Sequence, residues 1–184
     1  MVRRLVTLPA EIKTARLRLP LVTPAEAAAM RAGRRDSSWH PTYPRPDDVD
    51  AASMAREGDT WGPRHIVCDC LSGVPAESGA QRAISWGGGL AVGTIGPLGP
   101  PVDGEVEVGY GLVEAARGRG LATEALKALL AATDAAGVRV RAGVRPDNGA
   151  SLKVLAGCGF TELRGSNDEG ALVLARPLPD GGQG

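Results

Sequence analysis

Residues 105–130 read EVEVGYGLVEAARGRGLATEALKALL, and this one stretch combines a strand pattern, a glycine turn and a helix pattern. Residues 105–110 alternate between charged or small side chains and larger apolar ones, which is the period of a half-buried strand. Between residues 121 and 130 the apolar side chains recur along one face of a 3.6-residue period, which predicts a long helix. The stretch therefore predicts a strand, a tight turn and a helix in direct succession.

The turn between this strand and this helix, residues 117–120, has the sequence Arg-Gly-Arg-Gly. Its two glycines allow a tight turn and a close approach of the backbone to a ligand. The first N–H groups of the following helix have no partners within the helix and, together with the helix dipole, favour an anion. Because Arg117 and Arg119 add positive charge, the turn predicts a phosphate site, and most of all a pyrophosphate site.

Two common phosphate-binding patterns fit this turn poorly. A P-loop requires Gly-Lys followed by Ser or Thr, and no such tripeptide occurs in the chain. A dinucleotide fingerprint requires G-x-G-x-x-G/A, but Thr123 occupies its third position and no acidic residue ends the next predicted strand, residues 138–144. A nucleotide-binding oxidoreductase is therefore disfavoured.

A third pattern, R-x-x-G-x-A, is matched by Arg117, Gly120 and Ala122. It resembles the acetyl-CoA loop of the GCN5-related N-acetyltransferase (GNAT) superfamily. Farther along, Asn148 and Ser151 precede an apolar helix, and this order resembles the second half of the cofactor domain of the same superfamily. Two linked motifs at the expected separation make the resemblance much stronger than either motif alone.

Three further features resemble one branch of that superfamily, the ribosomal-protein N-terminal acetyltransferases (RimJ/RimL-like). They are the Gly-Phe pair at residues 159–160, the Glu-Val-Gly-Tyr run at residues 107–110, and the Thr-x-Arg-Leu-x-Leu opening at residues 14–19. The resemblance implies an α+β (mixed α/β) fold with a mostly antiparallel central sheet of about six to seven strands and about four flanking helices. It also implies that the central strand and the strand from Val138 splay apart, leaving a gap for the thioester.

The remaining elements follow from local patterns. Thr23 and Glu26 form a capping box that starts a helix running to about Gly33, and a second helix is expected to start at Asp47 or Asp48. Strands are expected at residues 14–19, 65–70, 82–86, 90–95 and 171–175, with a loop at residues 71–81. At 184 residues the chain is expected to be a single domain, residues 1–184, with an ordered core at 14–176 and a flexible tail at 177–184.

The resemblance implies acetyl-CoA as co-substrate and assigns residues to it. Backbone groups of Leu112 and Val113 would hold the pantetheine arm, and the N–H groups at the start of the helix would bind the pyrophosphate. Asn148 would bond the pantetheine and Ser151 would lie near the sulfur. The expected cofactor-binding residues are Leu112, Val113, Arg117, Gly118, Arg119, Gly120, Leu121, Ala122, Thr123, Asn148 and Ser151.

Acetyl transfer to an amine needs a group that accepts the proton of the amine. Glu107 is the expected base because it matches the Glu-x-Gly-Tyr pattern of the branch, and Glu105 on the same strand face is the alternate. Either one could instead be a solvated strand residue. Ser151 is the second expected catalytic residue, with helix capping as its alternative role. The later helix, residues 151–157, contains no tyrosine to act as an acid.

The acceptor is expected to meet the proline-rich segment at residues 34–48, which in the family commonly forms one wall of the acceptor pocket. Trp39, His40 and Tyr43 are its candidate substrate contacts, or else they pack at the edge of the core. The aspartates at positions 47, 48 and 50 would either line an acidic pocket or simply complement a helix N-terminus. The acceptor itself, a small-molecule amine or a protein N-terminus, stays open.

The leading functional hypothesis is an N-acetyltransferase that moves an acetyl group from acetyl-CoA to a primary amine by direct attack in a ternary complex. The alternatives are a non-catalytic acyl-CoA-binding sensor on the same fold, or transfer of another acyl group such as succinyl. Because 21 basic residues balance 21 acidic ones, no nucleic-acid or membrane partner is expected. With only two histidines in the chain, no metal site is expected, and three cysteines without a framework spacing indicate a cytoplasmic protein. The family resemblance also implies a homodimer.

Overall fold

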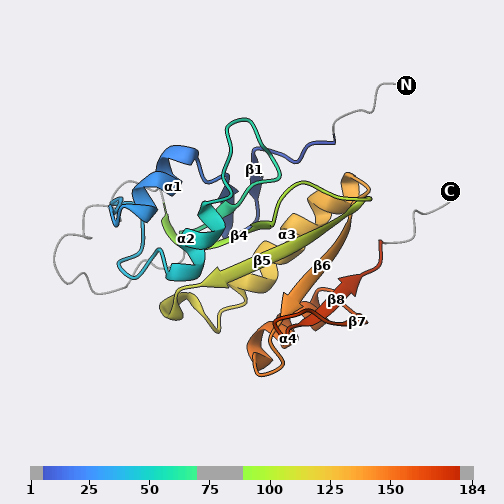
Figure 1. The fold of residues 1–184 in the computed structure, drawn as a ribbon. Helices are drawn as coiled ribbons and strands as arrows, with labels where there is room; N and C mark the ends of the chain where they lie inside the picture. Colours follow the sequence, from blue (N-terminus) through green and yellow to red (C-terminus); the bar gives the residue numbers. More distant parts are fainter. Residues whose placement is uncertain (1–5, 70–88, 179–184) are drawn as a thin grey trace.

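The computed structural model describes residues 6–69 and 89–178 (Figure 1). The strand expected at residues 82–86 and the loop expected at 71–81 lie outside these ranges, as do residues 179–184 of the expected tail.

Eight strands of the described residues form one sheet in the order β1-β2-β3-β4-β5-β6-β8-β7. β5 and β6 run parallel, and every other neighbouring pair is antiparallel. The strands are β1 (Glu11–Lys13), β2 (Leu17–Pro20), β3 (Arg64–Cys68), β4 (Leu90–Pro97), β5 (Glu105–Leu112), β6 (Arg139–Val144), β7 (Glu162–Ser166) and β8 (Leu172–Arg176). The mostly antiparallel α+β sheet is confirmed, with more strands than the six to seven expected.

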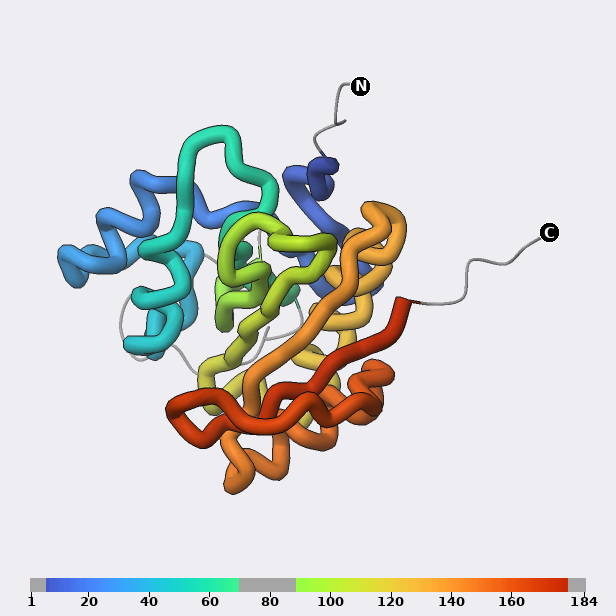
Figure 2. The backbone as a smooth tube through the Cα atoms, turned by 45° about the vertical axis from the view of Figure 1, so that its right-hand side comes forward, coloured from blue at the N-terminus to red at the C-terminus, as the bar shows by residue number. Residues whose placement is uncertain are grey.

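The helices lie on both faces of this sheet. α1 (Pro24–Arg31) and α2 (Pro46–Ala52) cover one face, and α3 (Leu121–Ala135) covers the other, where α4 (Gly149–Gly157) packs beside it (Figure 1). The tube view places β7 and β8 together at one edge of the sheet (Figure 2). A short 3-10 helix, Glu114–Ala116, connects β5 to the glycine turn. Four helices were expected, and the described residues contain four.

The capping patterns in the sequence predicted the starts of α1 and α2 close to their positions in the structure. α1 has the expected capping box. The Thr23 hydroxyl accepts from the Glu26 N–H, and the Glu26 carboxylate accepts from the Thr23 N–H. α2 starts at Pro46, one residue before the expected aspartates, because the Asp48 carboxylate reaches back to the backbone N–H of Arg45. The proline takes the first helical position, where its missing N–H has no cost.

β5 and β6 pair over only part of their length. Their register covers Glu105 with Arg139, Val106 with Val140 and Glu107 with Arg141. Beyond these pairs β5 continues to Leu112 and β6 continues to Val144 without pairing to each other. The two strands therefore separate toward their C-terminal ends, as expected.

The sheet edge near β1 is held by a buried arginine. Arg64 is fully buried and donates four hydrogen bonds to backbone carbonyls, those of Pro9, Ala10, Leu19 and Thr60, at 2.7–3.2 Å. Burial lowers the pKa of its guanidinium to about 10. The side chain thus joins the N-terminal segment, β2 and the chain before β3.

Arg64→Met is expected to destabilise the protein by about 3 kcal/mol or more, because each buried carbonyl that loses its donor costs about 1–3 kcal/mol. Urea unfolding followed by circular dichroism would measure the change. Arg31→Met, at an exposed position at the end of α1, is the matched control and should change stability by less than about 0.5 kcal/mol. Equal stability of the Arg64 variant and this control would contradict the structural role.

Three further observations bear on the expectations. No helix among residues 6–69 and 89–178 is long and apolar enough to cross a membrane. No group of three or more His, Cys, Asp and Glu side chains in these ranges is placed to hold a metal ion. Cys158 is free and buried, whereas Cys68 is disulfide-bonded.

Candidate active site

The glycine turn after β5 has the backbone shape that its sequence predicts. Gly118 and Gly120 have φ values of 71° and 75°, in the left-handed region that favours glycine. Gly120 is the N-cap of α3, and the first intrahelical bond runs from the Glu124 N–H to the Gly120 carbonyl. The N–H groups of residues 121–123 therefore have no partner within the helix. These donors at the helix N-terminus fit an anion such as a pyrophosphate.

The two arginines of the turn are placed differently. The Nε of Arg117 donates to the carbonyl of Leu112 at 3.1 Å, so this side chain folds back onto β5. Arg119 is exposed, and its carbonyl accepts a hydrogen bond from the side chain of Arg16. Arg16 comes from the turn between β1 and β2. Sequence reasoning noticed the motif that contains Arg16 but not its place beside this turn.

The gap between β5 and β6 is lined by backbone groups of β5. The Glu107 carbonyl accepts from the Leu98 N–H, and the N–H of Val113, the residue after β5, donates to the Val92 carbonyl, so both turn these backbone groups toward the β4 side. The strand alternation then directs the backbone groups of Tyr110 and Leu112 toward β6, past the point where pairing ends. Of the two expected pantetheine residues, Leu112 thus faces the gap, while the N–H of Val113 is already bonded.

Asn148 and Ser151 lie at the start of α4. The Asn148 side chain caps the helix, because its Oδ1 accepts from the Ser151 N–H at 3.0 Å. The carbonyl of Ser151 accepts a hydrogen bond from the Tyr110 hydroxyl at 3.3 Å, which links β5 to α4. Burial raises the pKa of Tyr110. Tyr110 also packs, partly buried, against the core. Its contact with Ser151 depends on how β5 and α4 lie together, and no local sequence signal predicts it.

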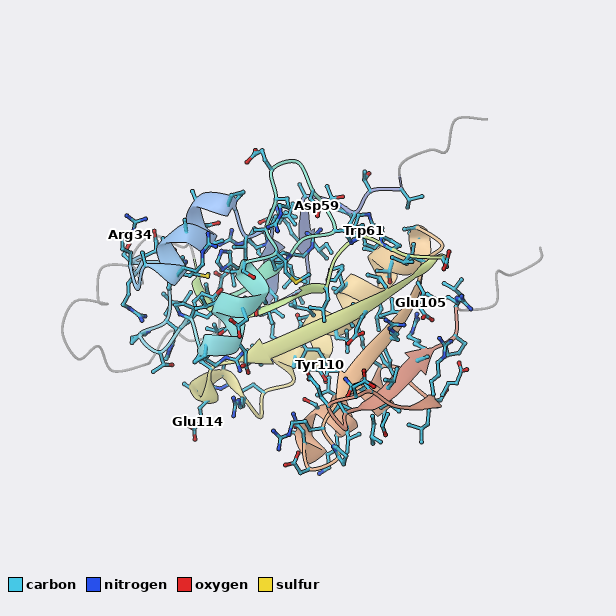
Figure 3. The ribbon with its side chains drawn as sticks, in the orientation of Figure 1. Arg34, Asp59, Trp61, Glu105, Tyr110 and Glu114 are labelled. Atoms are coloured by element: carbon cyan, nitrogen blue, oxygen red, sulfur yellow. The ribbon has the colours of Figure 1, made fainter. Side chains whose placement is uncertain are left out.

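Glu107, the expected base, belongs to a charged network on the open part of the sheet. Its Oε2 lies 3.2 Å from the Nε of Arg141, and its side chain is 34% exposed. Glu105, the alternate, is only 13% exposed and is paired with both Arg141 and Arg164. Figure 3 shows Glu105 and Tyr110 at separate points along β5. Glu107 is therefore the more accessible carboxylate, at the last residue pair before the strands separate.

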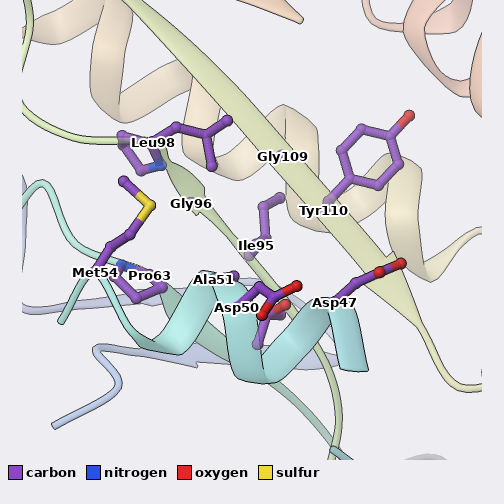
Figure 4. A pocket seen from close by; sticks show the side chains of 12 residues that line it. Asp47, Asp50, Ala51, Met54, Pro63, Ile95, Gly96, Leu98, Gly109 and Tyr110 are labelled. Carbon is purple, nitrogen blue, oxygen red and sulfur yellow. The ribbon is translucent and has the colours of Figure 1, made fainter. Parts of the chain in front are cut away.

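A cavity of about 360 Å³ lies between α2 and the sheet (Figure 4). Asp47 and Asp50 project from α2 toward β5, and Gly109 and Tyr110 form the β5 side. Most of the remaining wall is apolar and consists of Ala51, Met54, Pro63, Ile95, Gly96, Pro97 and Leu98, together with Thr94. The cavity thus combines two carboxylates with an apolar surface next to the strand that borders the gap.

Asp48 does not face this cavity, although its two acidic neighbours do. It is fully buried, forms a two-point contact with Arg45 at 2.8 and 2.9 Å, and accepts from the Thr94 hydroxyl at 2.7 Å. The Arg45 guanidinium lies directly over Gly111, where any side chain would collide with it. This contact fixes the start of α2 against β4 and β5.

Trp39, His40 and Tyr43, the expected substrate contacts, are all buried, and none of them lines the cavity. The Tyr43 hydroxyl bonds to Nδ1 of His65 at 2.8 Å, and the Trp39 ring meets the Tyr43 ring edge-on at 5.7 Å. Nε2 of the same histidine lies 3.4 Å from the Glu26 carboxylate. The structure places these aromatic residues between α1 and the sheet, and their role in substrate binding stays a prediction.

Comparison with known proteins identifies the family. The family model described as an acetyltransferase (GNAT) domain matches residues 16–161 of this chain. The chain belongs to the GNAT acetyltransferase family. GNAT acetyltransferases use acetyl-CoA as their cofactor.

Solved structures share the GNAT fold at low sequence identity. A GnaT-family acetyltransferase from Bordetella pertussis is 24% identical with a TM-score of 0.58, and the match covers 92% of this chain and 100% of the other. An acetyltransferase from Agrobacterium tumefaciens is 23% identical, with a TM-score of 0.57 over 96% of this chain and 99% of the other. The ribosomal-protein-S5-alanine acetyltransferase from Vibrio fischeri is 16% identical, with a TM-score of 0.58 and coverage of 94% and 98%. The search of curated proteins found no match.

Proposed function

We propose that this GNAT protein is an N-acetyltransferase that moves an acetyl group from acetyl-CoA to a primary amine by direct attack in a ternary complex. One observation carries the proposal. Tyr110 lies on the wall of the cavity under α2 and also borders the gap between β5 and β6, so the acceptor side and the cofactor side meet at this residue. A direct transfer requires such a meeting point.

The cofactor side is assigned to the glycine turn and the gap. Bound acetyl-CoA supplies an activated acetyl thioester. The N–H groups at the start of α3, with Arg117 and Arg119, would hold the pyrophosphate, and the backbone of Leu112 would hold the pantetheine arm. The side-chain amide of Asn148 and the hydroxyl of Ser151 would complete the far wall of the gap.

Glu107 is the proposed base for the acceptor amine, directly or through one water molecule. Its Oε2 lies 3.2 Å from the Nε of Arg141, which holds the carboxylate at the last residue pair before β5 and β6 separate. The Tyr110 hydroxyl, which donates to the carbonyl of Ser151 at the start of α4, is the proposed proton donor. This placement offers a tyrosine from β5 where α4 has none.

The cavity is the proposed acceptor site, and its chemistry fits a cationic amine with an apolar body. Asp47→Asn together with Asp50→Asn is expected to raise KM for such an acceptor about tenfold and to change kcat little, since two charge contacts are lost outside the reacting centre. Steady-state kinetics with a fixed amine would measure this. Asp168→Asn together with Glu169→Gln, a matched charge change at exposed positions, should leave KM unchanged. Equal kinetics in both double variants would place the acceptor elsewhere.

Four broader assignments belong to the same proposal. We assign the chain to the RimJ/RimL-like branch on its sequence motifs, and the fold shared with the Vibrio fischeri enzyme agrees with this. We also propose that residues 1–184 form one acetyltransferase domain, that the protein is cytoplasmic and that it forms a homodimer. Sedimentation at micromolar concentration would test the dimer, which predicts twice the mass of 18.9 kDa.

A thermal melt with and without excess acetyl-CoA tests the cofactor, with NADH and ATP as controls. A ligand at a hundred times its Kd adds about 2.7 kcal/mol to the folded state. For a domain of this size we expect Tm to rise by about 5–10 °C with acetyl-CoA alone. A shift with NADH but not with acetyl-CoA would contradict the cofactor assignment.

An amine screen with detection of the released thiol then tests catalysis. Thiol release that depends on the amine supports the acetyltransferase. Binding of acetyl-CoA without thiol release for any amine class would favour the non-catalytic sensor. Release with succinyl-CoA in preference to acetyl-CoA would favour the other acyl donor.

A further inference from the structure

The turn between β1 and β2 is fastened to the start of α3 by Arg16. Its Nη1 donates to the carbonyl of Arg119 at 3.0 Å, and its Nε and Nη2 each lie 2.6 Å from Oε2 of Glu124. These residues are separated by 103 and 108 positions in the chain. The guanidinium therefore bridges the glycine turn and the first turn of α3.

Glu124 holds this arginine in place. Its Oε1 accepts from the Thr14 hydroxyl at 2.6 Å and from the backbone N–H of Arg16 at 3.0 Å. Partial burial alone would raise the pKa of Glu124, but the hydrogen bonds from Thr14 and Arg16 lower it. The carboxylate thus stays ionised and paired. Arg16 also neutralises a negative charge that would otherwise lie close to an anion bound at the helix N-terminus.

The bond to Arg119 sets the direction of one peptide group. The carbonyl of Arg119 and the N–H of Gly120 belong to the same peptide, and in a trans peptide they point in opposite directions. Because the carbonyl is held toward Arg16, the N–H of Gly120 points away from it.

Nothing in the local sequence would hold this peptide otherwise. This peptide can turn over by rotation about ψ of Arg119 and φ of Gly120, and glycine adopts positive and negative φ about equally well. Without the bond from Arg16, the peptide between Arg119 and Gly120 would be free to turn over and would present a carbonyl in place of an N–H.

We propose that Arg16, held by Glu124 and Thr14, is a positioning residue of the acetyl-CoA site. It fixes the peptide between Arg119 and Gly120 so that the Gly120 N–H faces the bound pyrophosphate. This inference rests on the proposed function, since it requires that the glycine turn binds the cofactor.

Titration calorimetry of the purified protein with CoA tests the proposal. Arg16→Gln is expected to weaken CoA binding about tenfold, the factor that corresponds to one hydrogen bond with a charged partner. Arg16→Lys should stay weak, because an ammonium group lacks the planar fork that contacts Arg119 and Glu124 together. Arg18→Gln, two residues along the same segment, is the control and should bind CoA like the wild type.

Two further readouts separate positioning from stability. In two-dimensional ¹⁵N NMR, the Gly120 amide signal should shift on CoA addition in the wild type, and this shift should be smaller in Arg16→Gln. Glu124→Gln combined with Arg16→Gln should bind no more weakly than Arg16→Gln alone, because both changes remove the same contact. If Arg16→Gln does not fold, Thr14→Val keeps the arginine but removes one donor to Glu124, and we expect a loss of roughly threefold.

The outcomes distinguish this inference from the function on which it rests. Absence of CoA binding by the wild type would overturn the proposed function and the inference with it. Wild-type binding together with equal affinity in folded Arg16→Gln would overturn the inference alone. Full recovery by Arg16→Lys would also overturn it, since charge and not peptide orientation would then matter.

Discussion

Arg119→Glu combined with Gly120→Asp is expected to abolish acetyl-CoA binding while the protein stays folded. The new carboxylates would stand at the N-terminus of α3, where the free N–H groups and the helix dipole favour an anion. Gly120 has a left-handed φ of 75°, so an Asp at this position also strains the turn that would contact the cofactor. The two carboxylates would repel the pyrophosphate.

We expect an affinity loss of more than about a hundredfold, since two charge-assisted interactions are removed and repulsion is added. Calorimetry with acetyl-CoA would measure it, and circular dichroism would confirm the fold. The matched control is Gly33→Asp with Arg34→Glu, the same pair of changes at an exposed glycine with φ of 66° after α1. Retained affinity in the Arg119/Gly120 variant would overturn the assignment of the turn.

Glu107→Gln is expected to lower kcat at neutral pH by about a hundredfold or more, with little change in affinity for acetyl-CoA. General-base catalysis contributes about 10²–10⁴ in rate, and glutamine has the same shape but cannot accept the proton. The dependence of the rate on pH should also change, because the proposed base is gone. The pH–rate profile of the wild type and the variant would measure both effects.

Glu105→Gln is the control for this experiment. Glu105 lies on the same face of β5 but is held by two arginines and is less exposed, so its loss should affect kcat far less. An unchanged pH–rate profile in Glu107→Gln would exclude Glu107 as the base. The reverse pattern, a large loss in Glu105→Gln, would assign the role to the alternate carboxylate.

The glycine turn and the helix starts that we assign to the cofactor were largely predictable from sequence. Their signals are local: two glycines that need positive φ, a helix that starts directly after them, and a cap formed by Asn148 and Ser151 within four consecutive residues. Such features depend on the conformations and hydrogen bonds of neighbours in the chain. The structure therefore has the turn, the start of α3 and the start of α4 where the patterns predicted them.

The acceptor side was less predictable. Trp39 and Tyr43 lie in the proline-rich segment and were predicted to contact the substrate. In the structure they are buried against His65, more than 20 residues away in the chain. The cavity is instead lined by α2, β4 and β5, and of the acidic cluster only Asp47 and Asp50 reach it. Which of these side chains face the same space depends on how a helix lies on a sheet, and no local period encodes that.

The sequence by itself determined the family, the order of most elements and the glycine turn before α3, because each of these rests on short-range periodicity, capping and glycine conformations. The tertiary structure decided which side chains meet. It determined the hydrogen bonds from Arg64 to backbone carbonyls and the ion pair of Glu107 with Arg141. It also brought Arg16 to the glycine turn across more than 100 residues. The physical reason is that contacts between distant segments form only when the sheet assembles. The periodicity of a sequence indicates which face of a strand or helix is buried, but it does not indicate which other element packs against that face.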